Sequence, residues 1–152
     1  METQILIANH QKRIPLNPNR ITRFIKNILK SKGVLAACLS VVFVTDRKIK
    51  ALNRKFLKRN HATDVLAFDF GVDRVRRFRR ASRRPKEIYG EIVISTDTVF
   101  KNAKIFHTTS RRELDLCVIH GIRHLLGYDV HGAKDIKRMR RKEQELLKLI
   151  KP

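Results

Sequence analysis

Residues 110–131 read SRRELDLCVIHGIRHLLGYDVH, and this stretch decides how the rest of the chain is interpreted. Its apolar residues recur at helical spacing and predict a helix over 111–126. Ser110 and Glu113 match a capping box, in which each side chain satisfies a free backbone N–H of the first turn. Gly127 supplies the left-handed residue that ends the helix. The stretch therefore predicts one well-bounded helix followed by a turn.

The segments around this helix predict the other elements of the fold. A continuous β-branched run over 39–45 suits a buried strand, and Thr45 or Asp46 can cap the helix that follows it. Strands come early and helices late, which indicates an α/β or α+β domain with a small mixed sheet of about four strands and about five helices. The expected strands are 4–8, 39–45, 65–70 and 87–95, and the expected helices are 17–32, 46–57, 97–106, 111–126 and 132–149.

The composition points to a polyanionic partner. A chain of 152 residues is most simply a single domain, 1–152. It carries 35 Lys and Arg against 14 Asp and Glu, a formal net charge of +21, and so much like charge is best tolerated where a polyanion neutralises it. Hydrophobic residues make up 42% of the chain, close to ordinary globular usage, which excludes general disorder.

The cysteines and the apolar stretches predict a cytoplasmic protein. Cys38 and Cys117 stand alone with no CxxC spacing, as buried thiols of a reducing compartment do. The longest apolar stretch, 34–44, is too short to cross a hydrocarbon core of about 30 Å. The first residues do not have the pattern of a signal peptide. We therefore expect no membrane partner.

The histidines of the central stretch predict a metal site. His120 and His124 are four residues apart, which places both imidazoles on one helix face. The glycine turn at Gly127 can bring His131 back toward them, and three ligands with open positions are typical of catalytic zinc. The alternative is that His120 packs against the sheet and His131 is a solvated loop residue. Peptidase chemistry is disfavoured because Gly121 stands where an HExxH enzyme has its glutamate base.

These residues resemble a known family. The stretch from His120 to Asp129 looks like the HGxLHLxGYDH signature of the YbeY endoribonucleases. Further matches lie, in order and at near-family spacing, between about residues 40 and 149. Leu52-Asn53 together with residues 62–68 resembles the family's LN…PTDVLSF segment, and residues 90–95 resemble its G(D/E)IxIS strand. Glu113-Leu114 matches the family's EL, and Met139 with Glu143 matches its MxxxE.

The resemblance implies an α/β fold in which the histidine helix lines a basic cleft. It also implies one divalent ion, of zinc type, and cleavage of single-stranded RNA in ribosomal RNA maturation and ribosome quality control. The partners it implies are ribosomal RNA and the small ribosomal subunit, with ribosomal or GTPase proteins as further candidates. It leaves the oligomeric state open.

The sequence departs from the family pattern at the proposed site. The family's third histidine falls on Val130, so His131 is the expected third ligand and Asp129 the alternative. The family's functional arginine falls on Leu57. Arg123 replaces a leucine between the two helix histidines.

Basic residues are the candidates for binding and stabilising the reacting phosphate. Cations beside a metal stabilise developing charge in a site partly stripped of water, and the candidate catalytic residues are Arg54, Lys58, Arg59 and Arg123. A solvated cation is the alternative for each of them. Asp64 and Glu91 are expected to be structural groups that bond backbone or orient a histidine. The sequence leaves open whether a water or the ribose 2′-hydroxyl attacks.

A second basic segment lies between the third and fourth expected strands. So dense a run of arginine is typical of a polyanion contact, and an aromatic residue within it can stack on an unpaired base. The alternative is a flexible solvated loop. The candidate RNA-binding residues are Arg74, Arg76, Arg77, Phe78, Arg79, Arg80, Arg83 and Arg84.

The sequence thus predicts a metal-dependent, single-strand-specific endoribonuclease of ribosomal RNA. Leu57 and Val130 support an alternative, a ribosome-associated RNA-binding protein that keeps the fold and has lost turnover. A metallohydrolase of another phosphoester or amide is the third hypothesis.

Overall fold

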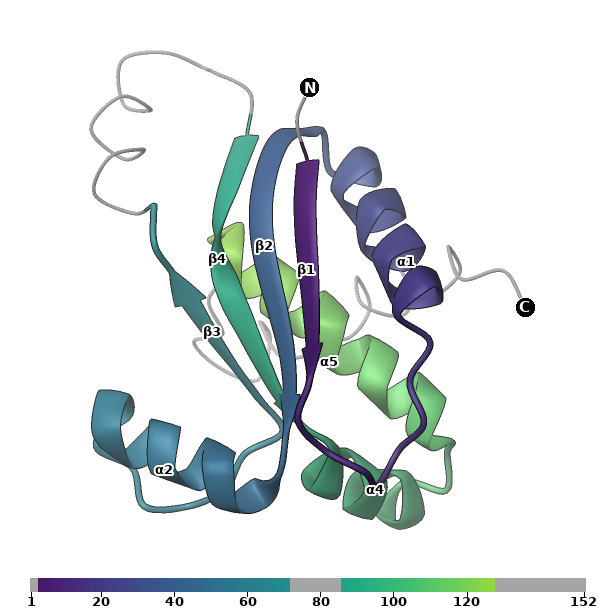
Figure 1. The fold of residues 1–152 in the computed structure, drawn as a ribbon, viewed down its shortest axis with the longest axis vertical. Coiled ribbons are helices and arrows are strands. Elements are labelled where there is room, and N and C mark those ends of the chain that lie inside the picture. The colour runs from purple at the N-terminus through teal and green to yellow at the C-terminus, as the bar shows by residue number, and fades with distance from the viewer. Residues whose placement is uncertain (1–2, 72–85, 128–152) are drawn as a thin grey trace.

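The computed structural model describes residues 3–71 and 86–127 (Figure 1). Within them the chain forms a mixed α/β structure, as predicted. The elements are β1 Thr3–Asn9, α1 Pro18–Ser31, β2 Val34–Val44, α2 Asp46–Leu57, β3 Val65–Asp69, β4 Lys86–Ser95, α4 Thr96–Ile105 and α5 Ser110–Leu125. The helix expected at 132–149 lies outside the described residues.

One four-stranded sheet, with strand order β1-β2-β4-β3, organises the fold. β1 and β4 run parallel to β2, and β3 pairs antiparallel with β4 at one edge. The register across the sheet aligns Ile7 with Val41, Val41 with Ile92 and Ile92 with Ala67. Helix α1 joins the parallel strands β1 and β2, a connection that packs the helix onto the sheet.

Helices α1 and α5 cover one face of the sheet. The side chains that α1 buries are at most 3% exposed and recur at helical spacing: Ile21, Phe24, Ile25, Ile28 and Leu29. They share one core with Leu39 and Val41 of β2, Ile92 of β4 and Val118 of α5. Burying each such side chain contributes about 1.5–3 kcal/mol to stability. This face holds most of the described core, because the other face has a smaller cluster.

Helix α2 packs on the opposite face of the sheet. Ile49 of α2 is buried against Val44, Leu66 and Val93 in a second, smaller cluster. Leu66 and Val93 alternate along their strands with residues that face α5, so the two clusters lie on opposite sides of β3 and β4. In Figure 1 the C-terminal end of α2 projects past the β3 edge of the sheet.

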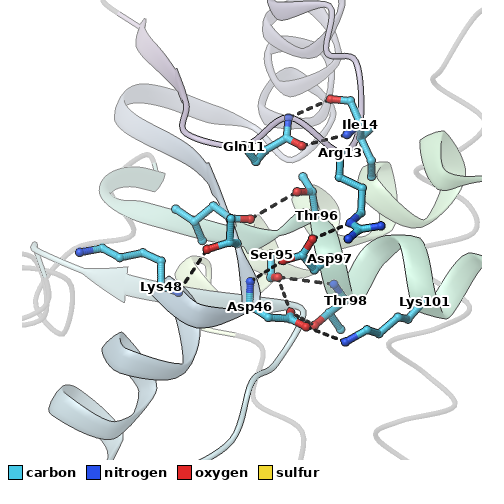
Figure 2. Close-up of polar contacts among 12 residues, drawn as sticks. Gln11, Arg13, Ile14, Asp46, Lys48, Ser95, Thr96, Asp97, Thr98 and Lys101 are labelled. Atoms are coloured by element: carbon cyan, nitrogen blue, oxygen red, sulfur yellow. Dashed lines mark hydrogen bonds and ion pairs between the residues drawn. The ribbon is translucent and has the colours of Figure 1, made fainter.

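The N-termini of α2 and α4 bind each other (Figure 2). Both helices follow directly on the carboxyl ends of parallel neighbours, β2 and β4, so they begin side by side. The Asp97 carboxylate accepts the backbone N–H of Asp46 at 2.9 Å, and Arg13 Nε donates to the same carboxylate at 2.6 Å. The Asp46 carboxylate accepts from Ser95 Oγ at 2.6 Å, Thr98 Oγ1 at 2.5 Å and Lys101 Nζ at 2.8 Å.

The Asp97 carboxylate thus satisfies a free backbone N–H of α2, and Ser95 Oγ accepts the backbone N–H of Thr98 at the start of α4. Both carboxylates lie at helix N-termini, where negative charge is favoured. Burial by itself would raise the pKa of Asp46, but the hydrogen bonds from Lys101, Ser95 and Thr98 outweigh it and lower that pKa. The carboxyl edge of the parallel strands, where many α/β proteins bind ligands, is therefore occupied here by the protein's own side chains.

A buried ion pair joins α1 to α5. Arg20 donates through both terminal nitrogens to the Asp115 carboxylate, at 3.1 and 2.9 Å, and the Asp115 side chain is only 2% exposed. Burial raises the pKa of Asp115 although Arg20 and Arg111 act to lower it. The pair fixes the orientation of α5 relative to α1.

The start of α5 differs from the prediction by one residue. Thr109, rather than Ser110, is the N-cap, and its Oγ1 accepts the backbone N–H of Arg112 at 3.1 Å. Glu113 does not close a capping box with Ser110, because its carboxylate accepts the Thr108 hydroxyl at 2.5 Å. Gly127 follows the helix with a φ of +93°, the left-handed residue that the sequence predicted.

Among the helices of residues 3–71 and 86–127, none has the length and apolar character that crossing a membrane requires.

Candidate functional site

Helix α5 presents the two histidines on a flank that the core does not cover. The helix packs against β3 and β4, and its inward residues Leu114, Val118 and Ile122 are at most 2% exposed. His120 is half-buried and His124 is exposed. One helical turn separates them on the same side of the helix, so both imidazoles are positioned together at the surface beside the β3 edge.

Gly121 allows this helix to approach the sheet closely. A Cβ at this position would lie 2.7 Å from Cγ2 of Ile92 on β4, well inside van der Waals contact. The position next to the first histidine therefore has no room for a glutamate, which agrees with the sequence argument against HExxH chemistry. The same close packing fixes the height of His120 and His124 above the sheet.

The segment between α2 and β3 contacts α5 one turn before His120. Cys117 is 5% exposed, and its Sγ lies 3.7 Å from Oδ2 of Asp64. The backbone carbonyl of Asp64 accepts the N–H of Ser95 at 2.8 Å. Asp64 thus ties the segment to both β4 and α5. This is a structural role, but the Asp64 side chain reaches the Cys117 thiol, and the sequence had predicted a backbone group or a histidine nitrogen as its partner.

Asn53 holds the other end of this segment, and the sequence had assigned it no role. Asn53 is 1% exposed, and its Nδ2 donates to the carbonyl of His61 at 3.0 Å. Its own carbonyl accepts the backbone N–H groups of Lys58 and, at 3.3 Å, Arg59. The sequence signal that could have predicted this role is the position of Asn53 on the apolar side of an amphipathic helix. A polar side chain is buried there only when it has hydrogen-bond partners.

The C-terminal end of α2 is an exposed basic turn. Arg54, Lys58 and Arg59 are all exposed, and Lys58 has a φ of 55°, a left-handed conformation unusual for a side-chain-bearing residue. The ion pairs that residues 3–71 and 86–127 make with one another use Arg13, Arg20 and Lys101 as cations. Within those residues no carboxylate neutralises the end of α2.

Leu57, where the resemblance predicts the family's functional arginine, is the last residue of α2 and is 49% exposed. An arginine at this position would therefore have had access to solvent. The exposed cations before and after Leu57 in the chain can pair with a phosphate group, which a leucine side chain cannot do.

Two of the other candidates are placed differently from what the sequence suggested. Arg123 is 3% exposed, so the structure encloses it in the protein between the two histidine positions. Glu91 alternates with Gly90 and Ile92, which face α5, and therefore points to the opposite side of the sheet. Glu91 consequently does not orient either helix histidine.

The predicted donor set for a metal ion lies only partly within the described residues. In residues 3–71 and 86–127, no group of three or more His, Cys, Asp and Glu side chains is arranged to hold an ion. His120 and His124 fit as two imidazole ligands, the donors that zinc prefers. The third ligand, His131 or Asp129, and the basic cleft remain predictions. These residues and the candidate RNA-binding residues lie outside the described part: Arg74, Arg76, Arg77, Phe78, Arg79, Arg80, Arg83 and Arg84.

Comparison with known proteins identifies relatives over almost the whole chain. A relative from Syntrophus aciditrophicus named endoribonuclease YbeY is 32% identical over 152 residues, covering 99% of this chain and 91% of the relative. Another of the same name, from Thermodesulfovibrio yellowstonii, is 32% identical and covers both chains completely. A solution structure of a Thermotoga maritima protein matches with a TM-score of 0.63 and 28% identity, over 97% of this chain and 89% of that one.

The family model described as endoribonuclease YbeY matches residues 6–151. This range contains β2, β3, β4, most of β1, the four described helices and both helix histidines. The chain therefore belongs to the YbeY endoribonuclease family.

Proposed function

We propose that this protein is a metal-dependent endoribonuclease that cleaves single-stranded ribosomal RNA in ribosome maturation and quality control. Family membership supports the endoribonuclease activity. The observation that carries the metal dependence is the pair of imidazoles, His120 and His124, one turn apart on the flank of α5 that is not packed into the core. His131 is the proposed third ligand and zinc the proposed ion. Bound there, the ion supplies a Lewis acid for a phosphate oxygen and a water of lowered pKa.

The chain's own residues hold and orient the substrate. The exposed guanidinium and ammonium groups of Arg54, Lys58 and Arg59 can bind phosphate oxygens, which accept hydrogen bonds and carry the negative charge. Asn53 and Asp64 anchor the two ends of the segment that follows, so this cationic turn is fixed relative to α5. Preorganised cations stabilise the charge that develops on the phosphate without having to reorganise during the reaction. Arg123, which is buried, can act only from within the protein.

The proposed setting is the cytoplasm, with the small ribosomal subunit as partner. The formal charge of +21 supports binding to ribosomal RNA, because each neutralised phosphate releases a counterion. Ribosomal proteins or a GTPase are proposed as further partners.

Leu57 favours a second candidate function, an RNA-binding protein without turnover. The leucine is exposed at the end of α2, where the family has its functional arginine. Tight binding of RNA by a metal-loaded protein that leaves the RNA intact would establish this alternative.

The decisive experiment compares cleavage of a single-stranded ribosomal RNA fragment and its duplex form by four proteins. They are the wild type, His120→Ala, His124→Ala and the control His107→Ala, which alters an exposed histidine at the end of α4. Metal catalysis contributes several kcal/mol, so each site variant should lose about a thousandfold in rate, whereas the control should match the wild type. Equal cleavage by all four proteins would overturn the proposal.

A further inference from the structure

Phe56 is the exposed end of an otherwise buried helix stripe. Ile49, Asn53 and Phe56 follow one another at helical spacing on the side of α2 that faces the sheet. Ile49 and Asn53 are at most 1% exposed, whereas Phe56 is 55% exposed. The C-terminal end of α2 projects past β3, the edge strand of the sheet (Figure 1), so the last turn of the stripe lies at the border of the sheet and not over its middle.

The ring of Phe56 makes an edge contact with a phenylalanine of the sheet. Its centroid lies 5.4 Å from that of Phe68 on β3, with an angle of 66° between the rings. Phe68 is itself half-buried in the cluster under α2. This T-shaped arrangement orients the Phe56 ring and leaves much of it open to solvent, so a ligand would meet an aromatic surface already fixed in orientation.

One cation contacts this aromatic surface, and three more lie within three residues of it in the chain. Lys55 Nζ lies 5.3 Å from the centre of the Phe56 ring, and Arg54, Lys58 and Arg59 are exposed on the same turn. Within the described residues none of the four forms an ion pair with a carboxylate. An exposed aromatic ring set among such cations is the combination that binds single-stranded nucleic acid, in which bases stack and phosphates pair.

We propose that Phe56 is a base-stacking subsite for an unpaired nucleobase of single-stranded RNA. The phosphates on either side of that base are bound by Arg54, Lys55, Lys58 and Arg59. Glu91 lies opposite Phe68 on β4, and its carboxylate repels phosphate from that side. The strand backbone therefore follows the cationic turn of α2. This inference rests on the proposed function, since it assigns a subsite for the same substrate.

The subsite is on the face of the sheet opposite α5, and the segment 58–64 runs from the end of α2 to Asp64, whose side chain contacts Cys117 of α5. Phe68, which contacts Phe56, lies on the edge strand β3. A strand bound at Phe56 and at the histidines would therefore run around that edge. Phe56 is a binding residue in this account, and it contacts a base remote from the bond that is cleaved.

Tryptophan fluorescence tests the inference directly, because the chain contains no tryptophan. Phe56→Trp and the control Phe106→Trp each introduce a single reporter, and Phe106 is a comparably exposed phenylalanine, 53%, at the end of α4. The ligands are a short 2′-O-methyl oligoribonucleotide, which resists attack by the ribose, and an abasic strand of the same length. We expect the oligoribonucleotide to quench the indole of the Phe56→Trp variant only, and the abasic strand to quench neither reporter although it still binds.

Affinity supplies the second measurement. Phe56→Leu keeps an apolar side chain over Phe68 but removes the stacking surface, and we expect it to weaken oligonucleotide binding by about 5- to 100-fold. Phe106→Leu should bind as the wild type does. Circular dichroism and thermal unfolding of each variant establish that the fold is retained.

Three outcomes would overturn the inference. If the fluorescence of Phe56→Trp stays unquenched while anisotropy shows that the oligonucleotide binds, no base stacks there. If Phe56→Leu binds as tightly as the wild type, and the wild type still cleaves RNA, the subsite fails and the proposed function stands. If the wild type neither binds nor cleaves single-stranded RNA, the proposed function fails and the inference fails with it.

Discussion

The two ends of α2 carry charge of opposite sign, and the fold neutralises only one of them. At the N-terminus the Asp46 carboxylate accepts hydrogen bonds from Ser95, Thr98 and Lys101, and Asp97 accepts from Asp46 and Arg13 (Figure 2). At the C-terminus, Arg54 and the residues after it meet no carboxylate among the described residues. The comparison separates charge that stabilises the fold from charge that is available to a polyanion.

The largest effect on stability is expected where a paired charge is most deeply buried. Replacement of Arg20 by Ala leaves the Asp115 carboxylate, 2% exposed, without its bidentate partner, and should destabilise the protein by about 3–5 kcal/mol. Denaturant unfolding measures the loss.

The loss should also depend on pH. The pKa of Asp115 is already raised by burial, with Arg20 acting to lower it, so removing Arg20 raises it further. Protonation then relieves the unpaired charge, and the cost of Arg20→Ala should be greater at about pH 7 than at about pH 4, near the ordinary Asp pKa. A cost that is small, or independent of pH, would show that this pair does not hold α1 on α5.

Asp46→Ala should cost about 2 kcal/mol, because it leaves the hydroxyls of Ser95 and Thr98 without their acceptor. The pKa of Asp46 is lowered in the folded protein. Its contribution is therefore complete above the ordinary Asp pKa of about 4 and is lost as the pH falls through the lower folded value. The stability difference between the wild type and Asp46→Ala should accordingly shrink in acid.

Lys101→Ala serves as the matched control for Asp46→Ala. It removes only the exposed half of the ion pair with Asp46 and should cost much less stability than Asp46→Ala does, because solvent screens an exposed charge. Neither variant should change RNA affinity. If Asp46→Ala is fully folded and still binds RNA more weakly than the wild type, the N-terminal end of α2 also contributes to RNA binding, which would contradict the distinction between the two ends.

At the basic C-terminal end of α2, substitutions should weaken RNA binding and leave the stability of the fold unchanged. The double variant Arg54→Ala/Arg59→Ala should bind single-stranded RNA about tenfold or more weakly, and the salt dependence of log Kd should fall by about one per cation removed. Its thermal stability should remain that of the wild type, since neither residue is paired within the described chain. An unchanged salt slope would show that these cations do not meet phosphates.

The smallest effect concerns the left-handed residue of this turn. Lys58 has a φ of 55°, so Lys58→Gly should relieve strain and raise stability by about 0.5–1 kcal/mol while weakening RNA binding. His107 has the same φ of 55° at the end of α4, and His107→Gly should raise stability without affecting RNA. Thermal unfolding and filter binding of both variants would distinguish strain from a contact with RNA.

Periodic segments could be predicted to within one or two residues at most ends. The stripe of α1, for example, is set by Ile21, Phe24, Ile25 and Ile28, whose spacing depends only on the helix itself. Strand β2 is longer than predicted, beginning at Val34 rather than 39, because Ala36 pairs with Glu87 on β4 and Ala37 pairs both with Ile88 on β4 and with Thr3 on β1. Pairing between distant segments leaves little local signal.

The candidate site shows the same limit. The helical spacing of His120 and His124 was enough to place both on one flank of α5, and the left-handed Gly127 was also predicted correctly. The burial of Arg123 was not predicted, since arginine side chains are mostly exposed. The roles of Asn53 and Phe56 depend on where α2 ends relative to β3, which is a property of the packed structure.

The most direct test of the account is cleavage of single-stranded RNA by the purified protein before and after removal of its metal. We predict about one divalent ion per chain, loss of cleavage on chelation, and recovery when zinc is restored. His124→Ala should neither retain the ion nor recover activity. Cleavage at an undiminished rate by the metal-free protein would contradict the account.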